Sequence, residues 1–148
     1  MLKIRKVEKE DCQLIFQWRN LPFIMNLGGL RKTVTLDEHT AWFHAGLKSN
    51  DRLLYITVID GENSGLTRFD KSPEGATVSI YLLEEFTGKG LGIETFQQAY
   101  SRMLTEWPET SVIAEVQLEN IYSQKFFQKL GFKTLATDEL VHFRLESI

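Results

Sequence analysis

Apolar and polar residues alternate along several stretches of the chain, and a period of two is the pattern of a strand with one buried face. Other stretches place apolar residues three or four positions apart, which predicts amphipathic helices. The predicted strands span residues 2–7, 52–60, 66–70, 76–84, 111–118, 134–137 and 140–145. The predicted helices span residues 11–20, 35–47, 93–106 and 120–130. This order predicts an α/β protein with a single mixed β-sheet of about seven strands flanked by four helices.

Capping residues mark the ends of three predicted helices. Thr35 and Glu38 have the spacing of a capping box, so a helix should begin there. We expect its buried stripe to contain Leu36, Thr40, Phe43 and Leu47. Trp107 and Pro108 should end the next helix, and Gly131 should end the last one.

Stretches that contain glycine or proline are predicted to be loops or turns. Residues 21–34 contain a proline together with Gly28 and Gly29, and they show no clear period, so we expect a loop there. Residues 61–65 begin and end with glycine and predict a hairpin turn. Residues 71–75 predict a second turn.

The composition bounds the class of protein. Of the 148 residues, 43% are apolar, which is enough for an ordinary core, and we expect residues 1–148 to form a single domain. The net charge of −3 and the scattered basic residues argue against a nucleic-acid surface. No apolar run is long enough to span a membrane, and the charged start of the chain lacks the apolar segment of a signal peptide. We expect a cytoplasmic protein, either a monomer or a homodimer.

Cysteine and histidine usage gives no sign of a disulfide or a metal site. The single cysteine, Cys12, cannot form an internal disulfide, and its apolar helix neighbours favour a packing role. The histidines are too dispersed for a shared ion, so no metal is expected. They are His39, His44 and His142.

A glycine-rich stretch lies between a predicted strand and a predicted helix and reads Phe-Thr-Gly-Lys-Gly-Leu-Gly over residues 86–92. Glycine lets the backbone take positive φ and approach a ligand closely, and free amides at a helix start attract anions. The stretch is not a P-loop, because Lys89 is followed by Gly90, nor a dinucleotide motif, because no third glycine follows Gly92. It predicts a loop that holds a pyrophosphate by main-chain amides. An ordinary turn before a helix is the alternative.

A second motif follows the strand predicted at residues 111–118. It begins with Asn120 and ends in Lys-Leu-Gly-Phe at residues 129–132. With both motifs in this order, the chain resembles the GNAT family, the acyl-CoA-dependent N-acetyltransferases. That family carries [RQ]-x-x-G-x-[GA] at the first motif, and Thr87 stands here in place of its Arg or Gln. The resemblance covers essentially the whole chain and is strongest over residues 72–133.

The resemblance implies a fold in which strands four and five splay apart and acetyl-CoA lies between them. The pantetheine arm would pair with the backbone of strand four, and the glycine-rich amides would hold the pyrophosphate. Asn120 would reach the pantetheine or cap a helix, and Ser123 would lie near the cofactor or permit helix packing. The implied cofactor-binding residues are Leu82, Leu83, Thr87, Gly88, Lys89, Gly90, Leu91, Gly92, Asn120 and Ser123.

The resemblance also suggests catalytic residues. Glu115 matches the strand-five glutamate base of the ribosomal-protein alanine N-acetyltransferases of this family. We expect it between apolar neighbours, where burial would raise its pKa toward a useful range; a surface carboxylate is the alternative. Phe127 stands where many relatives have a tyrosine that acts as general acid, and Tyr81 and Tyr122 are the candidate substitutes.

The chemistry tolerates a weak acid and favours a weakly basic amine. A thiol has a pKa near 8.5, so departure of coenzyme A as the thiolate at pH 7 costs only about 2 kcal/mol. Deprotonating an α-amino group costs roughly 1.4 kcal/mol at pH 7, whereas a lysine costs about 4.6 kcal/mol. We therefore expect an acceptor amine of lower pKa than lysine.

The first half of the chain resembles two subgroups of the family. One acetylates the N-termini of ribosomal proteins, and the other acetylates amino groups of nucleotide-linked aminosugars. The expected activity is acetyl transfer from acetyl-CoA to such a primary amine. Candidate acceptor contacts are Arg19, Asn20, Asn26, Arg31 and Arg68. Two alternatives stay open: a catalytically impaired acyl-CoA-binding or regulatory module, and an α/β domain outside this family that binds another phosphate ligand.

Overall fold

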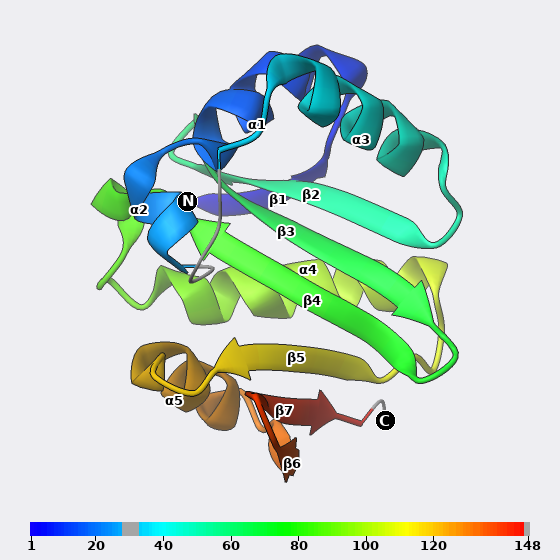
Figure 1. Cartoon of the computed structure of the whole chain (residues 1–148), viewed down its shortest axis with the longest axis vertical. Coiled ribbons are helices and arrows are strands. Elements are labelled where there is room, and N and C mark those ends of the chain that lie inside the picture. Colours follow the sequence, from blue (N-terminus) through cyan, green and yellow to red (C-terminus); the bar gives the residue numbers. More distant parts are fainter. Residues whose placement is uncertain (28–32, 147–148) are drawn as a thin grey trace.

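A seven-stranded sheet runs through the middle of the molecule, in the strand order β1-β2-β3-β4-β5-β7-β6 (Figure 1). The computed structural model describes residues 1–27 and 33–146. The strands are β1 (Leu2–Lys6), β2 (Arg52–Ile59), β3 (Glu62–Ser72), β4 (Gly75–Leu82), β5 (Val112–Gln117), β6 (Lys133–Thr137) and β7 (Leu140–Leu145). Neighbouring strands are antiparallel except β4 and β5, which are parallel. The predicted mixed sheet is confirmed.

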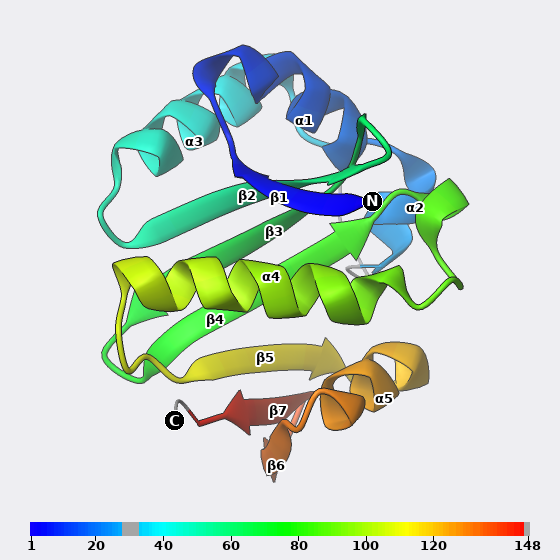
Figure 2. The same ribbon diagram turned by 180° about the vertical axis from the view of Figure 1, so that it is seen from behind.

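Helices cover both faces of the sheet. They are α1 (Cys12–Arg19), α2 (Pro22–Leu27), α3 (Leu36–Lys48), α4 (Leu91–Glu106) and α5 (Ile121–Lys129), with short 3-10 turns η1 (Lys9–Asp11) and η2 (Glu84–Phe86). In Figure 2 α4 crosses the sheet on the face turned to the viewer, whereas α1 and α3 pack at the β1–β2 end on the other face. None of the described helices has the length and apolarity needed to cross a membrane.

Each face of the sheet has its own apolar core. On the α4 face the innermost helix side chains are Phe96, Ala99 and Met103, each at most 1% exposed. On the other face the innermost helix side chains are Ile15, Trp18 and Phe43. The side chain of Cys12 packs against this second core, as predicted.

The loop predicted for residues 21–34 is wrong in its first part, because residues 22–27 form α2. Proline is well suited to the first position of a helix, since its missing N–H would have no intrahelical partner there. Ile24 anchors the short helix and is 1% exposed. Gly28 and Gly29 lie outside the described residues.

The capping box at the start of α3 is confirmed: Thr35 Oγ1 accepts from the Glu38 amide, and Glu38 Oε1 accepts from the Thr35 amide. The predicted stripe is wrong in part, because Leu36 and Leu47 are exposed. Phe43 is buried as expected, but the other buried residues of the helix are His39 and Gly46. A histidine can be buried at this position because both its ring nitrogens have partners.

The hairpin between β2 and β3 turns earlier than predicted. Asp60 and Gly61 both have positive φ, 49° and 84°, as in the two-residue turns that match strand twist. Residues 62–65 therefore belong to β3. Gly65 serves the strand rather than a turn, because a Cβ atom at this position would lie 2.3 Å from the Tyr81 carbonyl oxygen.

Strands β4 and β5 pair over only two residue pairs, Ala76 with Val112 and Thr77 with Ile113. Beyond these pairs β4 continues to Leu82 and β5 continues beside β7, and the two arrows diverge toward their C-terminal ends in Figure 1. The splay that the resemblance implied is confirmed.

Candidate active site

The glycine-rich loop joins η2 to α4 at the C-terminal end of β4. Gly88 and Gly90 have φ values of 74° and 75°, a conformation that other residues adopt only with strain. A Cβ atom at either position would have no heavy atom of the described residues within 4 Å, so space is not the constraint. Glycine is needed here for the path of the backbone.

The start of α4 leaves its amides open. The residue before the helix is Gly90, which has no side chain to cap it. Within the described part of the chain, the amides of residues 88–92 donate to no protein acceptor. These N–H groups and the helix dipole together favour a bound anion. Lys89 is exposed in the same loop and adds a positive charge.

Two residues of the loop have packing or turn roles that the sequence alone did not indicate. A Cβ atom at Gly92 would lie 3.0 Å from Cε1 of Phe126, so this glycine lets α5 pack against the start of α4. The hydroxyl of Thr87 donates to the Glu84 carbonyl at 2.7 Å and thereby stabilises η2.

The edge of β4 presents main-chain groups to the gap between β4 and β5. The Ala76 amide donates to the Ser111 carbonyl just before β5, so the main-chain groups of Ile80 and Leu82 also face this side, by the two-residue period of a strand. The amide of Leu83, by contrast, donates to the Ser64 carbonyl. Of the two residues predicted to pair with pantetheine, only Leu82 has its amide on the gap side.

Asn120 and Ser123 lie at the start of α5, just beyond the C-terminal end of β5. The Asn120 side-chain oxygen accepts from the Ser123 amide at 3.0 Å, which is the capping role considered from the sequence. The NH2 group of Asn120 is the part of this side chain that can donate to a ligand in the gap.

The aromatic candidates for proton donation lie in different surroundings. Tyr122, in the first turn of α5, is 73% exposed. Tyr81 packs edge-on against Trp18, and its phenol oxygen is buried on the α1 side of the sheet. Phe127 is 6% exposed and packs against three other phenylalanine rings.

Glu115 is not buried as expected: its side chain is 45% exposed. Ala114 and Val116 face the α4 core, so Glu115 lies on the opposite face, which none of the described helices covers at β5 (Figure 1). Its Oε2 atom is 3.4 Å from Nδ1 of His142, and the other ring nitrogen bonds Oδ1 of Asp138 at 3.0 Å.

Ser79 on β4 and Glu115 on β5 lie on the two sides of the gap. The last paired residues are Thr77 and Ile113, and Ser79 and Glu115 each lie two residues further along their own strands. Both side chains are on the face of the sheet that α1 and α3 cover elsewhere. This open face, bordered by the gap, is where an acceptor can reach a group held between β4 and β5.

The polar residues predicted as acceptor contacts have mixed outcomes. Arg19 and Arg68 lie on the face of the sheet that α1 and α3 cover, and both guanidinium groups lie over the ring of Trp42. Asn20 instead anchors the chain just before α3, since its side chain bonds both main-chain groups of Val34. Asn26 is exposed on α2, and Arg31 lies outside the described residues.

His39, which contacts Arg19, is a neutral imidazole. His39 is fully buried, and burial lowers its pKa; the charge of Arg19 lowers it further, against the opposing hydrogen bond to the Cys12 carbonyl. His39 Nε2 lies 2.8 Å from that carbonyl and must donate to it, so Nδ1, 3.1 Å from Arg19, accepts. Sequence reasoning treated this residue only as a non-ligand.

The described residues bring no three histidine, cysteine or carboxylate side chains into an arrangement for holding a metal ion. The site's chemical groups are main-chain amides, one exposed carboxylate–imidazole pair and guanidinium groups. Such a set suits binding of a phosphorylated ligand and transfer of a proton.

Comparison with known proteins identifies the family. A family model described as an acetyltransferase (GNAT) domain matches residues 1–133. A search of curated proteins found no match. The chain therefore belongs to the GNAT acetyltransferases, and acetyl-CoA is its co-substrate.

Solved structures have the same fold. A spermidine N-acetyltransferase from Vibrio cholerae, in complex with CoA and spermine, has a TM-score of 0.83 and 17% identity, over 97% of this chain and 92% of that one. The aminoglycoside acetyltransferase AAC(6')-Ib, in complex with coenzyme A, has a TM-score of 0.85 and 17% identity, over 99% and 95%. A domain from Methanocaldococcus jannaschii DSM 2661 has a TM-score of 0.83 and 19% identity, over 99% and 98%.

Proposed function

We propose that this chain, acting as a single domain, moves an acetyl group from acetyl-CoA to a primary amine by direct attack of the amine on the thioester. The observation that carries the proposal is the set of open amides at residues 88–92 beside the gap between β4 and β5. A phosphate group and an extended arm can be held at these two places at once. Family membership supplies the acyl donor that has both parts.

The donor would bind through main-chain groups. The amides of the glycine loop would hold the pyrophosphate, and each hydrogen bond to a charged acceptor contributes about 1.5–3 kcal/mol. The pantetheine arm would lie along β4, with the Leu82 amide donating into the gap, and the Asn120 NH2 group would approach it from α5. Ser123 would lie beside this arm. Thr87 stands at the position of the family's Arg or Gln, and its hydroxyl bonds within η2. Pyrophosphate binding would therefore rely chiefly on the main-chain amides.

Glu115 is the proposed base. An attacking amine must lose a proton, and a carboxylate must be accessible to accept it directly or through water. Glu115 meets this condition because it is exposed on the open face, across the gap from Ser79. His142 lies beside the carboxylate and can pass the proton toward Asp138 and solvent.

Tyr122 is the proposed proton donor to the departing thiolate. Its exposed position at the start of α5 supports this role better than the buried phenol oxygen of Tyr81 does. The contribution is expected to be small, because leaving as the thiolate at pH 7 costs only about 2 kcal/mol. Phe127 has no proton to give.

The proposed acceptor is the amine of a nucleotide-linked aminosugar or the N-terminus of a peptide. An amine of this kind loses its proton at neutral pH for roughly 1.4 kcal/mol, which a single exposed carboxylate can assist. A lysine side chain would need about 4.6 kcal/mol.

The test is release of CoA thiol from acetyl-CoA with a panel of nucleotide aminosugars, peptides and polyamines. We expect turnover with at least one amine of low pKa and formation of the N-acetyl product by mass spectrometry. Calorimetric titration with CoA supplies an independent measurement of donor binding. Failure to bind CoA would refute the proposal at its first step.

A catalytically impaired acyl-CoA-binding or regulatory module is the second candidate. Two observations favour it: Phe127 occupies the family's usual acid position, and Thr87 replaces the family's Arg or Gln. Tight CoA binding without turnover of any amine in the panel would support this reading over the first.

A further inference from the structure

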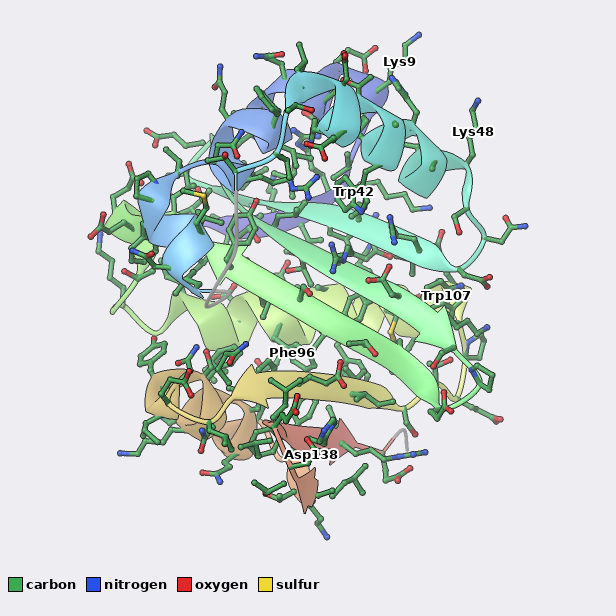
Figure 3. The ribbon with its side chains drawn as sticks, viewed as in Figure 1. Lys9, Trp42, Lys48, Phe96, Trp107 and Asp138 are labelled. Atoms are coloured by element: carbon green, nitrogen blue, oxygen red, sulfur yellow. The ribbon has the colours of Figure 1, made fainter. Side chains whose placement is uncertain are left out.

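Three arginine side chains from three different elements gather around one tryptophan on the face of the sheet that α1 and α3 cover. The guanidinium carbons of Arg19, Arg52 and Arg68 lie 4.4, 5.2 and 5.6 Å from the centre of the Trp42 ring. They come from α1, β2 and β3, so the fold rather than the local sequence brings them together. Figure 3 labels Trp42, which projects from α3 over the sheet.

The cluster carries a net positive charge, and ion pairs and partial burial hold its arginine side chains in place. Asp70 pairs with two of the cations, at 2.6 Å from Arg52 Nε and 2.8 Å from Arg68 Nε. The Arg52 and Arg68 side chains are 26% and 25% exposed, so each is fixed along its length and still open to a ligand. Glu38 also lies close enough to Arg19 to interact with its charge. Among the described residues, three guanidinium groups therefore face two carboxylates, which leaves the group positive.

Buried neighbours orient two members of the cluster. Neutral His39 accepts from Arg19 at 3.1 Å and is itself fixed by the Cys12 carbonyl. Arg68 donates to the Ser79 hydroxyl at 3.3 Å. Guanidinium groups held in fixed directions lose less freedom when they bind an anion, which favours affinity.

The register of the sheet connects this cluster to the gap. Arg68 lies opposite Ser79 on the neighbouring strand, and Ser79 and Glu115 each lie two residues beyond the last β4–β5 pair, on the two sides of the splay. The cations therefore lie on the β3–β4 side of the gap and the carboxylate lies on the β5 side. An acceptor on the open face can place its amine by Glu115 and another group over the cations.

We propose that Arg19, Arg52 and Arg68, assembled around Trp42, form an acceptor subsite for an anionic group, so that the amine substrate carries a phosphate or a carboxylate. This inference rests on the proposed acetyl transfer and narrows its acceptor. Planar guanidinium groups bind phosphate and carboxylate oxygens in pairs of hydrogen bonds. The same cluster repels a polycation, which sets this site apart from a polyamine site.

Matched acceptors test the subsite. Glucosamine is compared with glucosamine 6-phosphate, and alanylglycine amide with alanylglycine, so that the amine is nearly the same within each pair, at fixed acetyl-CoA. The anionic member of at least one pair should have a kcat/KM at least about 10-fold higher, in line with one charged hydrogen bond. The first pair reports a phosphate and the second a carboxylate. Equal or better turnover of both uncharged members would overturn the inference while leaving acetyl transfer intact.

Variants localise the effect. Arg68→Gln and Arg19→Gln should each raise KM for the preferred anionic acceptor about 10-fold and reduce the preference for it over the uncharged partner, whereas KM for acetyl-CoA stays within about 2-fold. Arg68→Lys should restore part of the loss. Arg144→Gln is the matched control, because it removes an arginine of β7 that pairs with Glu146. It should change neither the KM for the anionic acceptor nor the KM for acetyl-CoA.

A binding measurement separates this inference from the proposed function. With the glycine loop saturated by CoA, millimolar inorganic pyrophosphate should still raise the melting temperature of the wild-type protein, and Arg68→Gln should abolish that shift. A shift that persists in Arg68→Gln, or no shift in the wild type, argues against an anion subsite whether or not any amine is acetylated. Absence of CoA binding or of all turnover would instead count against the proposed function.

Discussion

His142 lies directly opposite Glu115 in the β5–β7 ladder, and its Nδ1 atom is 3.4 Å from Oε2 of Glu115. The far side of the imidazole bonds Asp138, which is anchored by the Leu140 amide. The pKa of Asp138 is lowered, first by that main-chain hydrogen bond and then by the bond from His142. The imidazole is thus held between two carboxylates at the edge of the open face.

Replacing Glu115 by glutamine should remove the proposed base without altering the shape of the side chain. Because positioned bases contribute roughly 10²–10⁴-fold, we expect kcat to fall about 100-fold with the best acceptor. Steady-state thiol release measures the rate, and calorimetry should show unchanged CoA affinity. Glu119→Gln alters another exposed glutamate two residues beyond β5 and is the matched control. Equal rates in both variants would remove Glu115 from the mechanism.

Gly90→Ala should weaken donor binding through the backbone. A residue other than glycine at a φ of 75° costs about 1–2 kcal/mol in strain, and relief of that strain would turn the amides away from the ligand. We expect CoA affinity to fall about 10-fold. Gly61→Ala is a close control, since Gly61 has a φ of 84° and equally open surroundings but lies in the β2–β3 hairpin. Both variants should lose similar stability in urea, and only Gly90→Ala should lose affinity.

Tyr122→Phe should reduce turnover modestly, and more at low pH. The thiolate leaves unaided at a cost of about 2 kcal/mol at pH 7, and each unit of lower pH adds about 1.4 kcal/mol. We therefore expect a loss of no more than about 30-fold at pH 7 that grows as the pH falls. The pH profile of kcat measures it. An identical loss in Tyr81→Phe, together with none in Tyr122→Phe, would reassign the donor.

His39 should make folding stability depend on pH. Its pKa in the folded state lies below the unfolded value of 6.5, chiefly because it is buried. The unfolded chain therefore binds more protons in acid, so the contribution of neutral His39 is complete above pH 6.5 and is lost as the pH falls from there toward the folded value. One group changes the unfolding free energy by at most about 1.4 kcal/mol per pH unit.

The variant His39→Gln should flatten this dependence. Urea titrations between pH 7 and pH 5 give the unfolding free energy at each pH, and the slope should be smaller in the variant than in the wild type. His44→Gln changes an exposed histidine on the same helix and serves for comparison. An unchanged slope in His39→Gln would mean that the titration of this residue does not couple to folding.

The sequence predicted the elements whose formation depends on residues close together in the chain. Strand alternation, the capping box at Thr35 and the glycine loop depend on neighbours a few residues apart, and these elements are present as expected. Helix α2 was missed because six residues are too few to show a helical period, and proline at its first position was interpreted as a loop signal. The Gly65 turn was wrong because a strand neighbour remote in sequence explains that glycine.

The candidate site was predictable only in part, because most of it depends on register. Glu115 is exposed, contrary to the prediction, because none of the helices in residues 1–27 and 33–146 covers that face at β5. The alternation along one strand cannot reveal this. The pairing of Arg52 with Asp70 follows from the β2–β3 register. The Asp-Gly sequence at residues 60–61 is typical of a two-residue hairpin turn. A turn predicted there would have placed Arg52 close to Asp70, so this dipeptide was the signal in the sequence.

Two residue pairs join β4 to β5, and β5–β7 otherwise adheres to the rest of the molecule through the packing of α4 and α5. A donor that bonds the unpaired edge of β4 and places its pyrophosphate on the glycine loop would add contacts between strands β1–β4 and strands β5–β7. The acyl donor would then stabilise the sheet as well as supply the acetyl group. Each catalytic cycle would remove this stabilisation when CoA leaves and restore it when the next acetyl-CoA binds.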